Sequence, residues 1–101
     1  MLQNNSSMFK IVFKPLAIKQ LKKIKRYHAR IILDAIESHL SEEPEKVHRS
    51  VIKRLRGKQD ATFRLRVQDY RVFYDVVEDA VEVIQILHKE NTPEFYQEEE
   101  E

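Results

Sequence analysis

The pattern of hydrophobic and polar positions predicts one strand and two helices in the N-terminal half of the chain. Phe9, Ile11 and Phe13 occupy alternate positions, which predicts a short strand that ends at Pro15. The period then becomes helical. A first helix is expected from Pro15 and a second from about Ala29 to Leu40, with apolar faces formed by Leu16, Ile18, Leu21, Ile24, Ile32, Leu33, Ile36 and Leu40. The two helices would form a hairpin.

The C-terminal half changes to a period of two. Three strands are expected at 62–67, 70–77 and 80–87, joined by turns at Gln68-Asp69 and Glu78-Asp79. Residues 45–60 form a polar connection that contains Gly57, the only glycine of the chain. We therefore predict an α+β fold. Its antiparallel-rich sheet combines one N-terminal strand with a three-stranded C-terminal meander, and an N-terminal helical hairpin packs on one face.

The first turn of the meander determines which residues face each other. With an even number of turn residues, Arg66 lies opposite Arg71 and Arg64 lies opposite Phe73, on one face of the sheet. The helices would cover the other face, which carries Phe63, Leu65, Val72, Tyr74 and Val83. The arginine face is expected to remain an open, half-apolar floor.

The second turn extends the arginine face onto the last strand. The expected register sets Phe73 beside Ile84 and Arg71 beside Ile86, with His88 further along the same face. Like charges that lie directly opposite each other destabilise a sheet, so Arg66 and Arg71 break a local rule. Such exceptions tend to occur at functional sites. A bound phosphate would relieve the repulsion, because guanidinium groups bind phosphate oxygens in a bidentate manner.

Charge is distributed unevenly along the 101 residues, although the net charge is only +1. Residues 1–74 carry 17 lysines and arginines against 7 acidic residues, whereas residues 75–101 carry 1 against 10. A basic body favours a polyanionic partner. We expect a disordered lead over 1–7, with Met1 or Met8 as the start, a single domain over 8–96, and an acidic tail over 97–101.

Several classes of protein are disfavoured by composition. The chain has no cysteine, which excludes disulfides and cysteine-ligated zinc. His28, His39 and His48 lack the spacing of metal ligands, so neither a metal nor another cofactor is expected. No apolar run approaches the roughly 20 residues of a membrane span. The N-terminal residues do not have the pattern of a signal peptide, and a cytoplasmic location with no membrane partner is expected.

The segment LRGKQDATFRLRVQDYRVFYDVVEDAVEVIQILHKENTPEFY, with the preceding strand and helical hairpin, resembles the RelE/ParE superfamily of toxins from toxin–antitoxin pairs. The resemblance spans about residues 8 to 96, and its strongest part is the aromatic-R-x-R-V-x-D-Y-R-V-x-Y pattern. It implies a small β-sheet with a helical hairpin on one face, and a cognate antitoxin as partner. Within the superfamily, RelE-like members cut messenger RNA on the ribosome without a metal, whereas ParE-like members inhibit DNA gyrase and lack the nuclease residues.

The RelE-like branch is favoured by resemblance at individual positions. Arg64 and Arg66 match its basic strand positions, Arg71 matches the arginine that contacts the scissile phosphate, and Tyr96 matches the C-terminal tyrosine of the active site. His88 and Lys89 stand where an arginine is common, and Gln68 stands where many relatives have glycine. Arginine cannot release a proton at useful pH. Proton transfer would therefore fall to Tyr96, His88 or Lys89.

We therefore expect a metal-independent endoribonuclease, an mRNA interferase that inhibits translation. The 2′-hydroxyl of the RNA would attack the adjacent phosphorus. Contact with ribosomal RNA is expected from the basic face of the first helix, formed by Lys19, Lys22, Lys23, Lys25 and Arg26. The alternatives are a ParE-like gyrase inhibitor and a degenerate, non-toxic relative that only binds the antitoxin.

Overall fold

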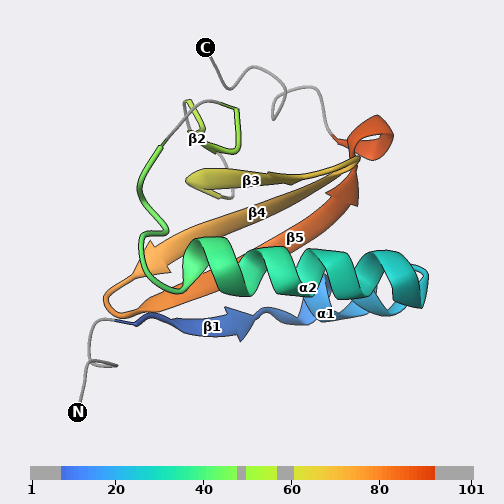
Figure 1. Cartoon of the computed structure of the whole chain (residues 1–101), viewed down its shortest axis with the longest axis horizontal. Coiled ribbons are helices and arrows are strands. Elements are labelled where there is room, and N and C mark those ends of the chain that lie inside the picture. Colours follow the sequence, from blue (N-terminus) through green and yellow to red (C-terminus); the bar gives the residue numbers. More distant parts are fainter. Residues whose placement is uncertain (1–7, 48–49, 57–60, 93–101) are drawn as a thin grey trace.

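The described part of the chain folds into a five-stranded mixed sheet with two α-helices, arranged as in Figure 1. The computed structural model describes residues 8–47, 50–56 and 61–92. Its elements are β1 (Lys10–Phe13), α1 (Pro15–Lys22), α2 (Arg26–Leu40), β2 (Ile52–Arg54), β3 (Phe63–Val67), β4 (Tyr70–Val77), β5 (Ala80–His88) and the short 3-10 helix η2 (Lys89–Asn91). The predicted α+β class is confirmed. The expected lead over 1–7 and tail over 97–101 lie outside the described residues.

The strands are arranged in the order β1-β5-β4-β3-β2. β3, β4 and β5 form the predicted antiparallel meander, and β1 lies parallel to β5, with Lys10 opposite Ala80. The edge strand β2 was not predicted. It lies inside residues 45–60, whose sequence predicts a polar connection, and its three residues are too few for alternation to reveal it.

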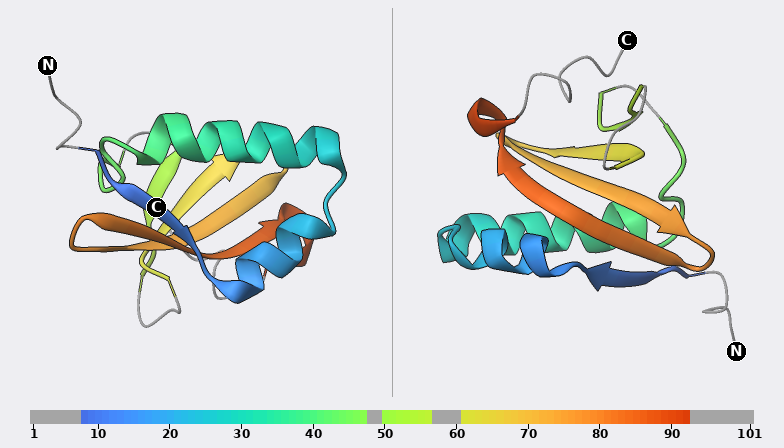
Figure 2. Two further views of the ribbon diagram at one scale, coloured as in Figure 1. Left: turned by 90° about the horizontal axis from the view of Figure 1, so that it is seen from below. Right: turned by 180° about the vertical axis from the view of Figure 1, so that it is seen from behind.

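The helices begin and end at positions that differ from the prediction. Pro15 is the first residue of α1, as expected for a residue with no backbone N–H to satisfy. α1 ends at Lys22 rather than after Ile24, and α2 begins at Arg26, three residues before the predicted start. α2 lies across the sheet, whereas α1 lies beside β5 (Figure 2). Ala17 of α1 is buried in the same core as the apolar residues of α2.

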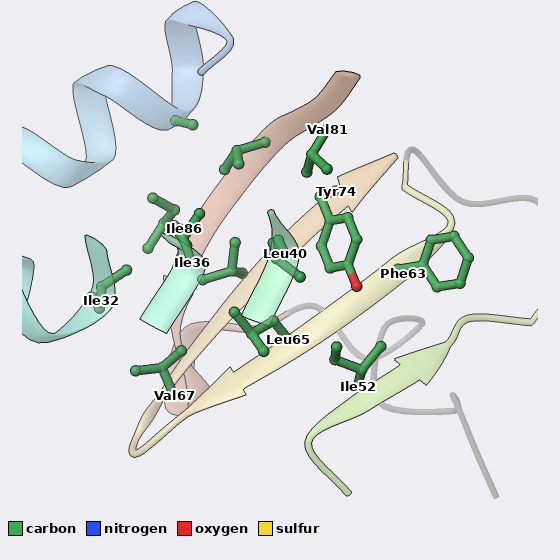
Figure 3. Close-up of a cluster of buried hydrophobic side chains, with 13 residues drawn as sticks. Ile32, Ile36, Leu40, Ile52, Phe63, Leu65, Val67, Tyr74, Val81 and Ile86 are labelled. Atoms are coloured by element: carbon green, nitrogen blue, oxygen red, sulfur yellow. The ribbon is translucent and has the colours of Figure 1, made fainter. Parts of the chain in front are cut away.

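The core lies between this side of the sheet and the apolar stripe of α2 (Figure 3). The stripe consists of Ile32, Ile36 and Leu40, all at most 1% exposed. Across from it lie the buried strand residues Phe63, Leu65, Val67, Val72, Tyr74, Val81, Val83 and Ile86. The predicted core face is therefore confirmed. The Tyr74 hydroxyl donates a hydrogen bond to the Pro44 carbonyl at 2.6 Å, which ties the segment after α2 to the sheet.

A β-bulge interrupts the pairing of β4 with β5. Near the turn the register is the predicted one, since Tyr74 lies opposite Val83, but beyond the bulge Phe73 lies opposite Gln85. One extra residue in β5, Ile84, causes this shift. Because neighbouring side chains point to opposite faces of a sheet, the shift reverses the face of every following residue of β5 relative to the prediction.

Candidate functional site

Arg64, Arg66 and Arg71 share the face of the sheet that is turned away from the helices. β3 pairs with β4 so that Arg66 lies opposite Arg71 and Arg64 lies opposite Phe73. Phe73 belongs to a second apolar cluster, separate from the helix-covered core, with Leu55, Ala61, Ile84 and Leu87. The predicted register of this hairpin and the common face of the three arginines are therefore confirmed.

Arg64 has an environment unlike that expected for an open floor. Its side chain is only 5% exposed, and its Nη1 donates hydrogen bonds to the carbonyls of Ser50 and Val51, at 2.7 and 3.5 Å. Leu55 and Ala61 pack on neighbouring Phe73. The expectation of an open face is wrong at this end of the sheet, because the segment that carries β2 folds back over it. Arg64 is placed to hold this segment rather than to meet a ligand.

Arg66 and Arg71 remain more accessible. Arg66 is exposed, and its Nη1 donates to the Ser50 hydroxyl at 2.8 Å. Arg71 is half-buried, and its Nη1 donates to the carbonyls of Gln68 and Tyr70, both at 2.9 Å. These bonds fix the Arg71 side chain beside the β3–β4 turn. We refer to Arg66 and Arg71 as the arginine pair.

Ser50 is a residue that sequence reasoning missed. Its carbonyl accepts from Arg64 and its hydroxyl accepts from Arg66, so it fixes two arginines of β3 at once. A serine in a polar connection gives no sequence signal for such a role, since it is a common residue of turns. The contacts of Ser50 could be predicted only if β2 were known, because the pairing of β2 with β3 brings this segment beside the arginines.

His88 lies on the opposite face from the arginine pair, which corrects the prediction that it shares their face. Beyond the bulge, Leu87 lies opposite Arg71, and His88 lies opposite Tyr70. The rings of Tyr70 and His88 are 5.2 Å apart in an edge-to-face arrangement. Tyr70 packs against the helix-covered core. His88 is therefore not beside the arginine pair.

The remaining candidates for proton transfer are Lys89 and Tyr96. Lys89 begins η2, and its ammonium group lies 3.5 Å from the carboxylate of Asp69 in the β3–β4 turn. The backbone N–H of Lys89 donates to the Asp69 carbonyl at 2.7 Å. These contacts bring Lys89 to the end of the sheet where Arg71 lies. Tyr96 lies outside the described residues.

The five basic residues expected on one helix face instead surround the corner between the helices. Lys19 and Lys22 lie on α1, whereas Lys23 and Lys25 lie in the connection and Arg26 begins α2. All five are exposed. The early end of α1 causes the difference. The elements that carry these cations lie at the end of the sheet that also carries η2 (Figure 1).

The buried phenol of Tyr74 has a shifted pKa. Burial raises the pKa of the Tyr74 phenol above its usual range, while the charge of Arg64 opposes this effect. Tyr74 is thus held neutral in the core. Within residues 8–47, 50–56 and 61–92, no group of three His, Asp or Glu side chains is arranged to hold a metal ion. No helix in this part of the chain is long and apolar enough to cross a membrane.

Most of the chain matches one known protein family. Residues 11–93 match the family described as the ParE toxin of type II toxin–antitoxin systems, parDE. The chain belongs to this family, and the predicted membership of the RelE/ParE superfamily is confirmed. The protein is thus classed as a toxin of a toxin–antitoxin system. No curated protein sequence matches the chain.

Solved structures with the same fold come from bacteria and archaea. The toxin–antitoxin complex RelBE2 from Mycobacterium tuberculosis contains a chain with a TM-score of 0.69 and 24% identity, covering 80% of this chain and 91% of that chain. For a chain of the archaeal RelE–RelB complex from Pyrococcus horikoshii, the TM-score is 0.62 and the identity 22%, with 84% of this chain and 99% of that chain covered. For the YoeB dimer from Staphylococcus aureus, the TM-score is 0.56 and the identity 16%, with 80% of this chain and 97% of that chain covered. These likenesses concern the fold.

Proposed function

We propose that this toxin is a ribosome-dependent mRNA endonuclease of the RelE type. The observation that supports the proposal is the arginine pair. Arg66 and Arg71 lie opposite each other across β3 and β4. Like charges at such positions destabilise a sheet by repulsion. A phosphate bound between them would replace this repulsion with charge-assisted hydrogen bonds. A pair of this kind suits a reaction in which negative charge develops on a phosphoryl group.

The reaction begins when the 2′-oxygen of a ribose attacks the adjacent phosphorus. The 2′-hydroxyl proton passes to a base, the bond from phosphorus to the 5′-oxygen breaks, and this oxygen receives a proton from an acid. The products are a 2′,3′-cyclic phosphate and a 5′-hydroxyl end. Arg66 and Arg71 stabilise the charge of the pentacoordinate transition state but cannot transfer protons.

The other candidate residues divide into two groups. Arg64 acts as a positioning residue through Ser50, whose hydroxyl also contacts Arg66. Lys89 and Tyr96 are the proposed acid and base. The position of Lys89 at the same end of the sheet as Arg71 supports its assignment. The assignment of Tyr96 rests on the sequence resemblance alone. The position of His88 on the other face argues against a direct part in this chemistry.

The proposed partners are messenger RNA, the ribosome and a cognate antitoxin, and the proposed location is the cytoplasm. The exposed cations Lys19, Lys22, Lys23, Lys25 and Arg26 would contact ribosomal RNA, so affinity for ribosomes should fall steeply with salt. The antitoxin would neutralise the toxin, in keeping with the family to which the chain belongs.

The test is induced expression followed by mapping of mRNA ends. Cuts confined to translated messages, absent from a message whose start codon is removed, are the expected result. Arg66→Ala and Arg71→Ala should remove the cuts. Arg30→Ala is the matched control, since Arg30 is exposed on α2 and forms an ion pair with the exposed carboxylate of Asp34 at 4.0 Å. Toxicity without any new mRNA ends would overturn the proposal.

A second candidate function is inhibition of DNA gyrase. The ParE family match favours it, and so does the burial of Arg64, which leaves two accessible arginines rather than three. Supercoiling of relaxed plasmid by purified gyrase distinguishes the two functions. Inhibition that survives Arg71→Ala would identify a gyrase inhibitor, whereas unchanged supercoiling together with translation-dependent cuts would identify the nuclease. Neither effect would identify a non-toxic, antitoxin-binding relative.

A further inference from the structure

An open cavity lies at the corner between the two helices, on the opposite face of the sheet from the arginine pair. Its volume is about 430 Å³, within the range of roughly 300–1,000 Å³ that is typical of small-molecule sites. The side chains that matter for its chemistry are Lys23, Lys25, His28, Tyr70, His88 and Asn91. They come from the α1–α2 connection, α2, β4, β5 and η2, which meet at one end of the fold (Figure 1).

Three rings form one wall of the cavity. The ring of Tyr70 lies between two imidazoles, with centroid distances of 5.9 Å to His28 and 5.2 Å to His88. All three side chains are half-buried, so each packs on the protein and still reaches the opening. Aromatic and imidazole rings in this state provide platforms on which an unpaired nucleobase can stack.

The His88 ring is held in one orientation. Its Nδ1 accepts a hydrogen bond from the N–H of Glu90 at 3.1 Å, which leaves Nε2 as the ring donor. The Thr92 hydroxyl donates to the His88 carbonyl at 3.2 Å, and η2 is tied to the β3–β4 turn through Lys89 and Asp69. The wall is thus formed before any ligand binds, which lowers the entropy cost of binding.

Cations line the rim of the cavity. Lys23 and Lys25 are exposed and lie beside Lys22 and Arg26, whereas none of the described residues that line the cavity is acidic. An apolar ligand would gain nothing from these charges. An acidic peptide would use the lysines but not the rings. A nucleotide uses both, because its phosphate binds lysine ammonium groups and its base stacks on the rings.

We propose that this cavity binds one nucleotide of a single-stranded RNA, with the base against Tyr70 and the imidazoles and the phosphate at Lys23 and Lys25. Tyr70 and Arg71 are neighbours in β4 but point to opposite faces of the sheet. An RNA strand that passes the β3–β4 turn would therefore reach both the cavity and the arginine pair. The choice of RNA rests on the proposed function, whereas the cavity and its chemistry do not.

Nuclear magnetic resonance tests the site directly in the purified, ribosome-free protein. Short oligoadenylate RNA, the DNA of the same sequence and adenosine monophosphate are each titrated while the ring resonances of the histidines are followed. We expect RNA to shift His28 and His88 but not His39, which is exposed elsewhere on α2. Adenosine monophosphate should give the same shifts more weakly. Because the proposed cleavage needs the ribosome, the RNA stays intact, and failure of binding is distinguished from failure of cleavage.

Variants then assign the contacts. Tyr70→Leu should weaken RNA binding about tenfold, as expected for the loss of one stacked base, and Tyr70→Phe should bind as the parent does. The double variant Lys23→Ala/Lys25→Ala should bind more weakly and show a smaller salt dependence. Lys10→Ala/Lys46→Ala, which removes the same charge elsewhere, is its control.

Three results would overturn the proposal. The first is an absence of shifts at His28 and His88 on titration with RNA. The second is equal weakening by the two lysine double variants, since a diffuse field rather than a site would then hold the RNA. The third is equal affinity for the DNA, which would contradict the assignment to RNA. The lysine variants and the titration remain decisive if Tyr70→Leu fails to fold.

Discussion

Tyr70 and His88 lie directly opposite each other on β4 and β5, and their rings meet on the face of the sheet that Arg71 does not share. The sheet therefore separates His88 from the arginines with which the sequence pattern groups it. The arginine pair lies on one face, and His88 lies on the other. The roles of the two groups can be tested independently.

Arg71→Ala should lower the rate of translation-coupled mRNA cleavage by about 10²–10³, the effect of removing one group that stabilises transition-state charge. Stability should change little, because the lost hydrogen bonds to Gln68 and Tyr70 are offset by relief of the repulsion from Arg66. Cleavage kinetics and urea unfolding provide the two measurements. His88→Gln is the comparison, and a larger rate loss for His88→Gln than for Arg71→Ala would contradict the assigned faces.

Arg64→Ala should lower the free energy of unfolding by about 2 kcal/mol, because two carbonyls of the covering segment lose a buried, charged donor. Arg66→Ala on the same strand removes the same charge from an exposed position and should cost about 0.5 kcal/mol or less. Urea unfolding of both variants checks this difference. Equal losses would show that Arg64 does not hold the segment around Ser50.

Stability should decrease at alkaline pH because of Tyr74. Burial raises its pKa in the folded state above the usual value of about 10, so the unfolded chain ionises first. The stabilisation is complete below about pH 10 and is lost as the pH rises through the folded-state pKa. Tyr74→Phe should remove this part of the decrease, although it loses the bond to Pro44, worth about 1 kcal/mol. Parallel pH dependences of the two proteins in urea unfolding would refute this prediction.

Glu78→Gly should raise the free energy of unfolding by up to about 1 kcal/mol. Glu78 has a φ of 55°, in the left-handed region that costs a residue with a Cβ roughly 1–2 kcal/mol. Glycine recovers this cost and loses about 0.5–1 kcal/mol through its freer unfolded chain. Asp79→Gly in the same turn is the control and should only destabilise. Thermal unfolding compares the two, and a lower melting temperature for Glu78→Gly would contradict the strain.

The sequence predicted most of the fold because its period changes where the structure changes. Alternation from Thr62 onward was sufficient to predict β3, β4 and β5, and it placed Arg66 opposite Arg71. β2 was not predicted, since its three residues form a strand by pairing with β3 and show no alternating pattern of their own. The start of α2 at Arg26 was not predicted either, because Arg26, Tyr27 and His28 carry no periodic apolar signal.

The candidate site was predicted less completely because it depends on irregular features. A single extra residue at Ile84 moved His88 to the other face, and alternation alone assumes that no such residue exists. The burial of Arg64 depends on tertiary contacts with Ser50 and Val51, which lie more than ten positions away in the chain. Arg66 and Arg71 were predicted correctly because only the even turn between them sets their positions.

The parallel pairing of β1 with β5 has a consequence for the order in which the protein acquires its structure during synthesis. Lys10 finds its partner only when Ala80 has been made, so the first strand leaves the ribosome long before the strand that it joins. Local hairpins form quickly, whereas contacts between distant parts of a chain form late. A nascent chain that stops before β5 therefore has neither the full sheet nor a covered core. The sheet is completed only when β5 pairs with both β1 and β4.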